Sequence, residues 1–360
     1  MIRIDKRTKA VYILAALSLL FLALAKLIAE RPLPEREEML KASNLMQTAI
    51  ETIGRCQEEK GVAVDPDEDI NQTGLIGLET SLITTSLGNL AAKRTTVNPN
   101  FAGLIVRLLC EAGVRSGDPV AIGASSSFPA LVVATLCAIE ALDGRALLIC
   151  SLGASQWGAN RPDFSWPEIQ ECLRLSGMIG TEPIALSLGG ESDVGMDMSP
   201  AGRAYLTRKA EEAGVPFLAD PDLETNVRRR LSLYQAAAGR RAIKAFVNIG
   251  GGYANMGTDS EILKVSPGLA IFSRIPAPQQ RGVIFEMAAR GVPVIHLLYV
   301  KGLCERYGLP WDPRPLPQPG QGKIFGARAV ALFPFSALAG AYLLVCGLIL
   351  AFIRRTPEET

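Results

Sequence analysis

Four loops rich in glycine, serine and asparagine each follow an apolar, strand-like run in this chain of 360 residues. The first loop, residues 123–127 (GASSS), leads into Pro129 and a long apolar segment. Proline fits the first turn of a helix, and Ser127 fits the N-cap, where a hydroxyl accepts a backbone N–H. The stretch 118–142 therefore predicts a strand, a tight turn and a helix. Polar loops at helix N-termini are natural sites for anionic or polar ligand groups.

The same pattern recurs in CSLGASQWGAN, LSLGGESDVG and NIGGGYANMG. Loops that follow parallel strands meet at one edge of a sheet, where ligands bind in open α/β folds. We expect one pocket there, and its polar side chains are Ser125, Ser127, Ser151, Ser155, Asn160, Asp193, Asn248 and Asn255. The alternative for each loop is plain turn chemistry, in which Asn, Asp and Gly supply positive φ angles.

Nucleophilic catalysis is a second hypothesis for the first loop. Ser125 and Ser127 stand where an α/β-hydrolase carries its nucleophile, although the G-x-S-x-G pattern is incomplete. The only histidine, His296, lies in an apolar strand, and Asp193 or Asp259 would complete a triad. A lone strand histidine is more often a wall residue. The sequence leaves open whether the protein is an enzyme.

The stretch 73–100 mixes Thr, Gly and Ser with Leu and Ile, and it contains the adjacent cations Lys93 and Arg94. We expect it to fold over the sheet edge as a lid or wall and to bring both cations to an anionic ligand. The alternative is an ordinary connection between helices.

Strands alternate with helices along the central part of the chain, which predicts an α/β fold with a mostly parallel sheet and helices on both faces. The expected strands are 119–123, 146–151, 183–188, 244–249, 269–272 and 293–298. The expected helices are 35–60, 99–110, 128–142, 167–176, 200–213, 222–238, 280–290 and 301–307.

Both ends contain apolar runs of about the ~20 residues that cross a bilayer. Basic residues precede the first run, and Arg354 and Arg355 follow the second, which places both termini in the cytoplasm by the positive-inside rule. The alternatives are a cleaved signal peptide for the first run and a buried core helix for the second. The expected divisions are a cytoplasmic tail (1–9), a membrane helix (10–29), a helical region with the lid (30–117), an extracytoplasmic α/β domain (118–310), a proline-rich tether (311–326), a second membrane helix (327–353) and a cytoplasmic tail (354–360).

Charge and cysteine usage exclude several classes. The 37 Lys and Arg nearly balance the 36 Asp and Glu, so no broad nucleic-acid face is expected. The one basic run, Arg228-Arg229-Arg230, is interpreted as a solvated helix face, with a functional groove as the alternative. The seven cysteines have no metal-binding spacing and indicate no particular disulfide. Neither a Walker loop nor a dinucleotide fingerprint occurs, so no metal or cofactor is expected.

Taken in order, TGLIGLETSLITTSLGNLAAKRTTVNPNFAGL, VAIGASSSFPAL, SLGASQWGAN, SLGGESDVG and NIGGGYANMG resemble the membrane-bound poly-γ-glutamate system protein family. Ser126 stands where that pattern has glycine. The resemblance implies an accessory role in making or exporting poly-γ-glutamate at the bacterial cytoplasmic membrane. It also implies the bilayer, other membrane proteins of that system and the polymer itself as partners. A membrane-anchored serine-type hydrolase or transferase acting on γ-glutamyl or related amide bonds is the alternative.

Overall fold

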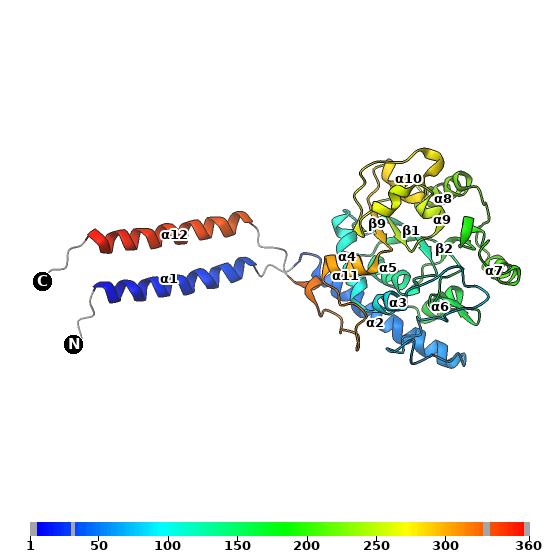
Figure 1. The fold of residues 1–360 in the computed structure, drawn as a ribbon, viewed down its shortest axis with the longest axis horizontal. Helices are drawn as coiled ribbons and strands as arrows, with labels where there is room; N and C mark the ends of the chain where they lie inside the picture. Colours follow the sequence, from blue (N-terminus) through cyan, green and yellow to red (C-terminus); the bar gives the residue numbers. More distant parts are fainter. Residues whose placement is uncertain (1–5, 30–32, 327–331, 356–360) are drawn as a thin grey trace. The chain divides into compact units, whose positions relative to one another are not determined.

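The computed structural model describes residues 6–29, 33–326 and 332–355 (Figure 1). The described chain forms two compact units. One contains the two terminal helices, and the other comprises residues 37–324. The outermost parts of the two expected cytoplasmic tails, residues 1–5 and 356–360, lie outside the described residues.

The terminal unit consists of α1 (Lys6–Ala29) and α12 (Leu332–Arg355), which pack against each other. Each contains a 19-residue stretch, Thr8–Lys26 or Pro334–Phe352, that is long and apolar enough to cross a membrane. Phe21 stacks on Tyr342 with ring centroids 4.6 Å apart. The Tyr342 hydroxyl also lies 2.8 Å from the Ser18 hydroxyl. The two apolar helices thus form a pair, which is compatible with a membrane anchor.

A seven-stranded sheet, in the order β6-β5-β2-β1-β7-β9-β8, organises the larger unit. Its strands are β1 (Pro119–Ser125), β2 (Arg145–Ser151), β5 (Pro183–Ser187), β6 (Phe217–Leu218), β7 (Ala245–Ile249), β8 (Gly268–Leu269) and β9 (Val294–Leu297). Neighbours pair parallel, except that β8 runs antiparallel to β9. From β1 the chain first builds outward through β2, β5 and β6, and then returns to place β7 on the other side of β1. The strand order therefore reverses between β1 and β7, which is where open α/β sheets bind ligands.

Helices lie on both faces of this sheet (Figure 1). They are α2 (Arg36–Glu59), α3 (Leu90–Thr96), α4 (Asn100–Glu111), α5 (Pro129–Ala141), α6 (Trp166–Leu175), α7 (Pro200–Glu212), α8 (Leu223–Ala238), α9 (Tyr253–Met256), α10 (Val283–Ala289) and α11 (Val300–Tyr307). Short 3-10 turns are η1 (Glu191–Asp193), η2 (Ser260–Lys264), η3 (Pro278–Gln280) and η4 (Lys323–Phe325).

Packing follows from the sequence pattern of each helix. α5 is apolar on nearly every side and is buried between α4 and strands β1 and β2, as expected for a helix without a polar face. On the opposite face, Tyr234 of α8 and Phe285 of α10 pack in one core with Ala121 and Phe246 of the sheet. The predicted α/β fold with a mostly parallel sheet is therefore confirmed.

Local differences from the predicted elements have simple causes. The two-residue strand β6 and the hairpin of β3 (Asn160–Arg161) and β4 (Phe164–Ser165) are too short to show a periodic pattern. The N-cap of α5 is Phe128, which provides no side-chain cap, and not Ser127. The Ser127 hydroxyl instead accepts the Ser155 backbone N–H at 2.9 Å, because the loop after β2 folds against this turn.

Two long segments are fastened to the sheet unit. Residues 73–100 run beside the loop that follows β2, where backbone bonds join Thr85 N–H to the Ala154 carbonyl and Trp157 N–H to the Leu78 carbonyl. The proline-rich segment 311–326 is held by the Asn100 side chain. That amide donates to the Gln318 and Gln321 carbonyls at 3.1 and 3.0 Å. These contacts hold residues 73–100, the wall segment, against the loop that follows β2, and residues 311–326 against the start of α4.

A disulfide between Cys56 of α2 and Cys172 of α6 closes a sequence separation of 116 residues. The sequence did not indicate this pair, because the spacing of two distant cysteines carries no signal. A cross-link over so long a loop restricts the unfolded chain strongly.

Replacing the pair in a Cys56→Ser/Cys172→Ser variant is expected to lower the free energy of unfolding by about 2–4 kcal/mol. Denaturant unfolding of the full chain in detergent measures this loss. A reductant should reproduce it in the wild type and have no effect on the double variant. Equal midpoints for the oxidised wild type and the variant would contradict the expectation.

Candidate functional site

Three adjacent strands end in serines at the carboxyl edge of the sheet. Ser125, Ser151 and Ser187 are paired in register across β1, β2 and β5. Side chains of paired residues in parallel strands point to the same face, so the three hydroxyls form a row. All three residues are buried; α8 packs against β2 and β5, and Gly250 lies against Ser125. This edge is therefore polar yet almost closed to solvent.

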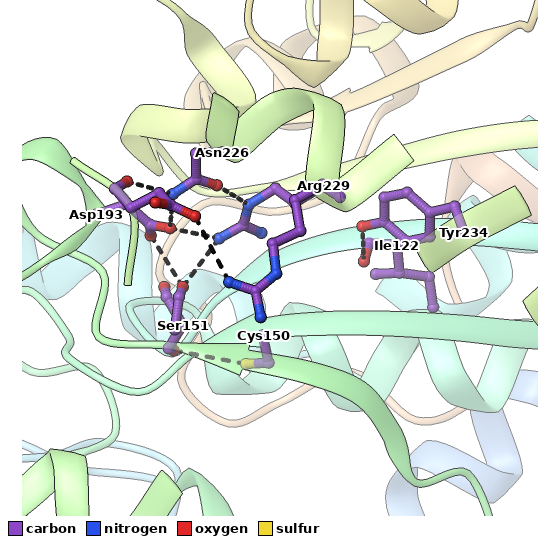
Figure 2. A network of polar contacts seen from close by, with 10 residues as sticks. Ile122, Cys150, Ser151, Asp193, Asn226, Arg229 and Tyr234 are labelled. Carbon is purple, nitrogen blue, oxygen red and sulfur yellow. Dashed lines mark hydrogen bonds and ion pairs between the residues drawn. The ribbon is translucent and has the colours of Figure 1, made fainter. Parts of the chain in front are cut away.

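A buried ion pair lies over the β5 end of this row. Arg230 of α8 donates to the Asp193 carboxylate at 2.6 Å and to the Ser187 hydroxyl at 2.9 Å. Asn226, one turn earlier, donates to the same carboxylate at 3.0 Å (Figure 2). Both charged side chains are only 3% exposed. Because a buried charge needs a partner, this network fixes the loop after β5, in which Asp193 has a φ of 62°.

Two amide side chains dominate the other end, next to β7. Asn248 donates to the Gly250 carbonyl at 2.8 Å and approaches Nδ1 of His296 at 3.1 Å. Asn255 of α9 lies over Gly123, where a Cβ atom would come within 2.5 Å of the amide nitrogen, so a larger residue here would have to displace the Asn255 side chain. Within the described residues, the amide oxygens of Asn248 and Asn255 are buried and have no hydrogen-bond partner. Burying a polar atom without a hydrogen bond costs free energy, so these two oxygens are available acceptors for a hydrogen-bond donor.

A small cavity joins the two ends of the edge. It is lined by Ala124, Ser151, Asp193, Arg230, Gly252, Ala254 and Asn255. Its volume is about 10 Å³, the space of one water molecule. A larger ligand therefore has to displace α9, a single turn between Gly252 and Gly257. Of the predicted pocket residues, Ser151, Asp193 and Asn255 line this cavity.

A second cluster lies beside the first, around the N-terminus of α5. The Lys93 ammonium group is 2.8 Å from the Ser155 hydroxyl and also contacts the Ser127 carbonyl. The Ser125 hydroxyl donates to the Ser127 hydroxyl at 2.9 Å. Lys93 lies 3.9 Å from the centre of the Phe128 ring and is 2% exposed. Burial strips the amine of hydration and lowers the pKa of Lys93 to about 7.

The remaining predicted binding residues have structural partners. Asn160 is completely buried, and its amide binds the Leu78 backbone and the Thr84 hydroxyl, which holds the wall segment against the β2 loop. Arg94 forms a two-pronged ion pair with Asp312 at 2.8 Å. The structure thus separates the adjacent cations: Lys93 lies at the serine cluster, and Arg94 holds the proline-rich segment.

The predicted Ser-His-Asp triad is not assembled. Asp193 follows β5 and His296 lies on β9, four strand positions or about 19 Å across the sheet. Asp193 is also committed to Arg230, and Asp259 to Arg274 at 2.7 Å. The hydrogen-bonding neighbour of His296 Nδ1 is the Asn248 amide and not a carboxylate. Burial lowers the pKa of His296 to about 4, which keeps the ring neutral at pH 7.

Arg230 is the important residue that the sequence interpretation missed. Arg228 and Arg229 are exposed, as expected for a solvated helix face, but Arg230 is 2% exposed. Its spacing to the buried residues Val227 and Tyr234 places it on the inward stripe of α8. That helical spacing was the sequence signal for burial of Arg230. It was missed because the three consecutive arginines were interpreted together as one solvated face.

The buried, neutral His296 predicts a pH dependence of stability. Its pKa rises from about 4 in the folded state to about 6.5 in the unfolded chain, so only the unfolded state takes up a proton in between. This contribution, about 3 kcal/mol, is complete above pH 6.5 and is lost as the pH falls towards 4. Unfolding of the wild type and of a His296→Gln variant between pH 7 and 4 measures it. The variant should show the shallower decline, and parallel curves would refute the expectation.

Comparison with known proteins identifies no relative: no protein-family model, no curated protein and no solved structure matches this chain. The arrangement of its own side chains is therefore what a function has to be inferred from.

Proposed function

We propose that the protein is a membrane-anchored component of poly-γ-glutamate synthesis or export that binds the polymer at the carboxyl edge of its sheet. The observation that carries this proposal is the pair of buried amide oxygens on Asn248 and Asn255, which have no partner among the described residues and lie where the strand order reverses. An oxygen acceptor without a partner is suited to a ligand that brings N–H groups.

A γ-linked glutamate chain provides such donors at every amide bond. The Asn255 oxygen at the cavity would accept an amide N–H. The serine hydroxyls, beside the positive N-terminal end of α5, would serve the carboxylates. Arg230 contributes little net charge because Asp193 neutralises it. Binding of this kind is selective for amides but moderate in strength, which suits a polymer that has to be released again.

Location in the bacterial cytoplasmic membrane, with the sheet unit outside, is supported by two features. Apolar helices precede and follow the sheet unit in the chain, and basic residues flank them on the outer sides in sequence. The Cys56–Cys172 disulfide suits an oxidising compartment, because such bonds rarely persist in the cytosol. Other membrane proteins of the same system are the proposed partners.

Binding is tested by titrating the full-length protein in detergent with poly-γ-glutamate. An Asn255→Leu variant keeps the approximate size of the side chain but removes the acceptor, and it should bind about 10-fold more weakly, as for one lost hydrogen bond. The matched control is Asn44→Leu on the exposed face of α2, which should bind like the wild type. Absence of wild-type binding, or equal affinity of both variants, would contradict the proposal.

Orientation is tested with reporter fusions in a bacterial host. A reporter after residue 200 should be active only as an exported enzyme, and reporters at either terminus only as cytoplasmic ones, because the basic flanks resist translocation. An N-terminal reporter found outside would refute the two-span arrangement. A mature chain that begins near Lys26 would establish the signal-peptide alternative.

A further inference from the structure

We propose that Lys93 and Ser155 form an acyl-transfer site in which the lysine amine is the general base and the serine hydroxyl is the nucleophile. This inference goes beyond the binding function proposed above and does not depend on it. It replaces Ser125, Ser127 and His296 as the candidate catalytic group, since those three residues do not assemble a triad.

The geometry meets the first requirement of such a pair. The Lys93 nitrogen lies 2.8 Å from the Ser155 oxygen, within the range for direct proton transfer. The nitrogen is further oriented by the Ser127 carbonyl and the Phe128 ring. Ser155 is itself fixed, because its backbone N–H donates to the Ser127 hydroxyl at 2.9 Å. Nucleophile, base and an orienting group thus occur together, which is the general signature of an activated serine.

The burial of Lys93 is not explained by an ion pair. Among the described residues, no carboxylate forms an ion pair with Lys93, whereas its neighbour Arg94 is paired with Asp312. α3 packs against α5 and α11. The charged residues of those two helices, Glu140, Lys301, Glu305 and Arg306, are all exposed to solvent.

A buried ammonium group without a counter-ion is costly even with the Ser127 carbonyl and the Phe128 ring beside it, and the positive end of α5 adds to that cost. Burial accordingly lowers the pKa of Lys93 to about 7, so a large fraction of the amine is free to accept a proton near neutral pH. A buried lysine whose amine is partly deprotonated is suited to act as a general base rather than as a structural cation.

Partly exposed residues surround Ser155 at the rim of the β2 loop. Ser155 is 6% exposed, and Ser127, Gln156 and Trp157 around it are partly exposed. Trp157 has a φ of 56°, which is rare for a bulky residue. Its N–H group bonds the Leu78 carbonyl and its indole donates to Glu68 at 2.7 Å. The wall segment therefore holds this loop in a strained conformation next to the hydroxyl, as is common at functional sites.

The reaction class that fits is transfer of an acyl group from an amide or ester. Ser155 Oγ forms a bond to the carbonyl carbon while its proton passes to the Lys93 amine. The bond from carbon to the leaving nitrogen or oxygen then breaks, and the lysine returns the proton to that atom. A water molecule or an acceptor amine next attacks the acyl-serine, gives its proton to Lys93, and releases the acyl group as Ser155 recovers its proton.

The test is covalent labelling of the full-length protein in detergent with a fluorophosphonate, which forms an Oγ–P bond and releases fluoride. We expect one adduct, located at Ser155 by mass spectrometry, with a labelling rate that rises through about pH 7 as Lys93 loses its proton. Ser155→Ala should remove the adduct. Lys93→Met should slow labelling at pH 8 by about 100-fold or more, the usual share of a general base. The exposed Ser86→Ala variant is the matched control and should label like the wild type.

The proposal is overturned by an adduct on another residue, by no adduct on folded protein, or by a Lys93→Met variant that labels at the wild-type rate. The unfolding midpoint of each variant reports whether it is folded. The adduct position and pH profile of the wild type need no variant, so a Lys93→Met protein that does not fold still leaves the proposal decided. Polymer binding without labelling would refute this site alone, and labelling without binding would refute only the proposed function.

Discussion

The burial of polar groups at the carboxyl edge of the sheet is the constraint on which this structure depends. In most parallel sheets this edge opens to solvent, but here α8, α9 and residues 73–100 cover much of it. A covered polar edge is stable only if its groups find partners within the protein. The pair of Arg230 and Asp193, with Asn226 and Ser187, meets this need at the β5 end. Polar groups elsewhere along the edge that lack such a partner therefore call for an explanation.

The exceptions fall at two neighbouring places. Near β7, the amide oxygens of Asn248 and Asn255 are buried and find no partner in the described part of the chain. Near the start of α5, Lys93 is buried beside the Ser155 hydroxyl, and no described carboxylate is its counter-ion. The first place suits a ligand with N–H groups, and the second suits proton transfer. Both are costly for stability, which is common where function and not packing has determined the residue.

The wall segment links these places to the rest of the fold. Gly77 lies so close to the Gly158 carbonyl that a Cβ atom would come within 1.9 Å of it, so only glycine permits this contact. The contact, together with the bonds of Asn160, fixes the β2 loop and hence Ser155. Arg94 and Asp312 then join α3 to the proline-rich segment that precedes the second apolar helix in the chain. The segment expected to contribute ligand-binding cations thus also positions the site.

The sequence by itself determined the longer strands and helices of the sheet unit and their order. Alternating apolar strands and helices specified the α/β fold, because a strand covered on both faces has to be apolar throughout and a long helix has to show its period. The same reasoning found the four polar loops, since their glycines and serines interrupt apolar runs.

Sequence reasoning could not identify the partners of the side chains in these loops. Whether Asp193 faces His296 or Arg230 depends on strand order, and β5 and β9 lie on opposite sides of β1. Whether Lys93 or Arg94 points inward depends on the rotation of α3, and the Cys56–Cys172 bond depends on the packing of α2 against α6. These contacts join residues far apart in the chain, so only the tertiary structure could decide them.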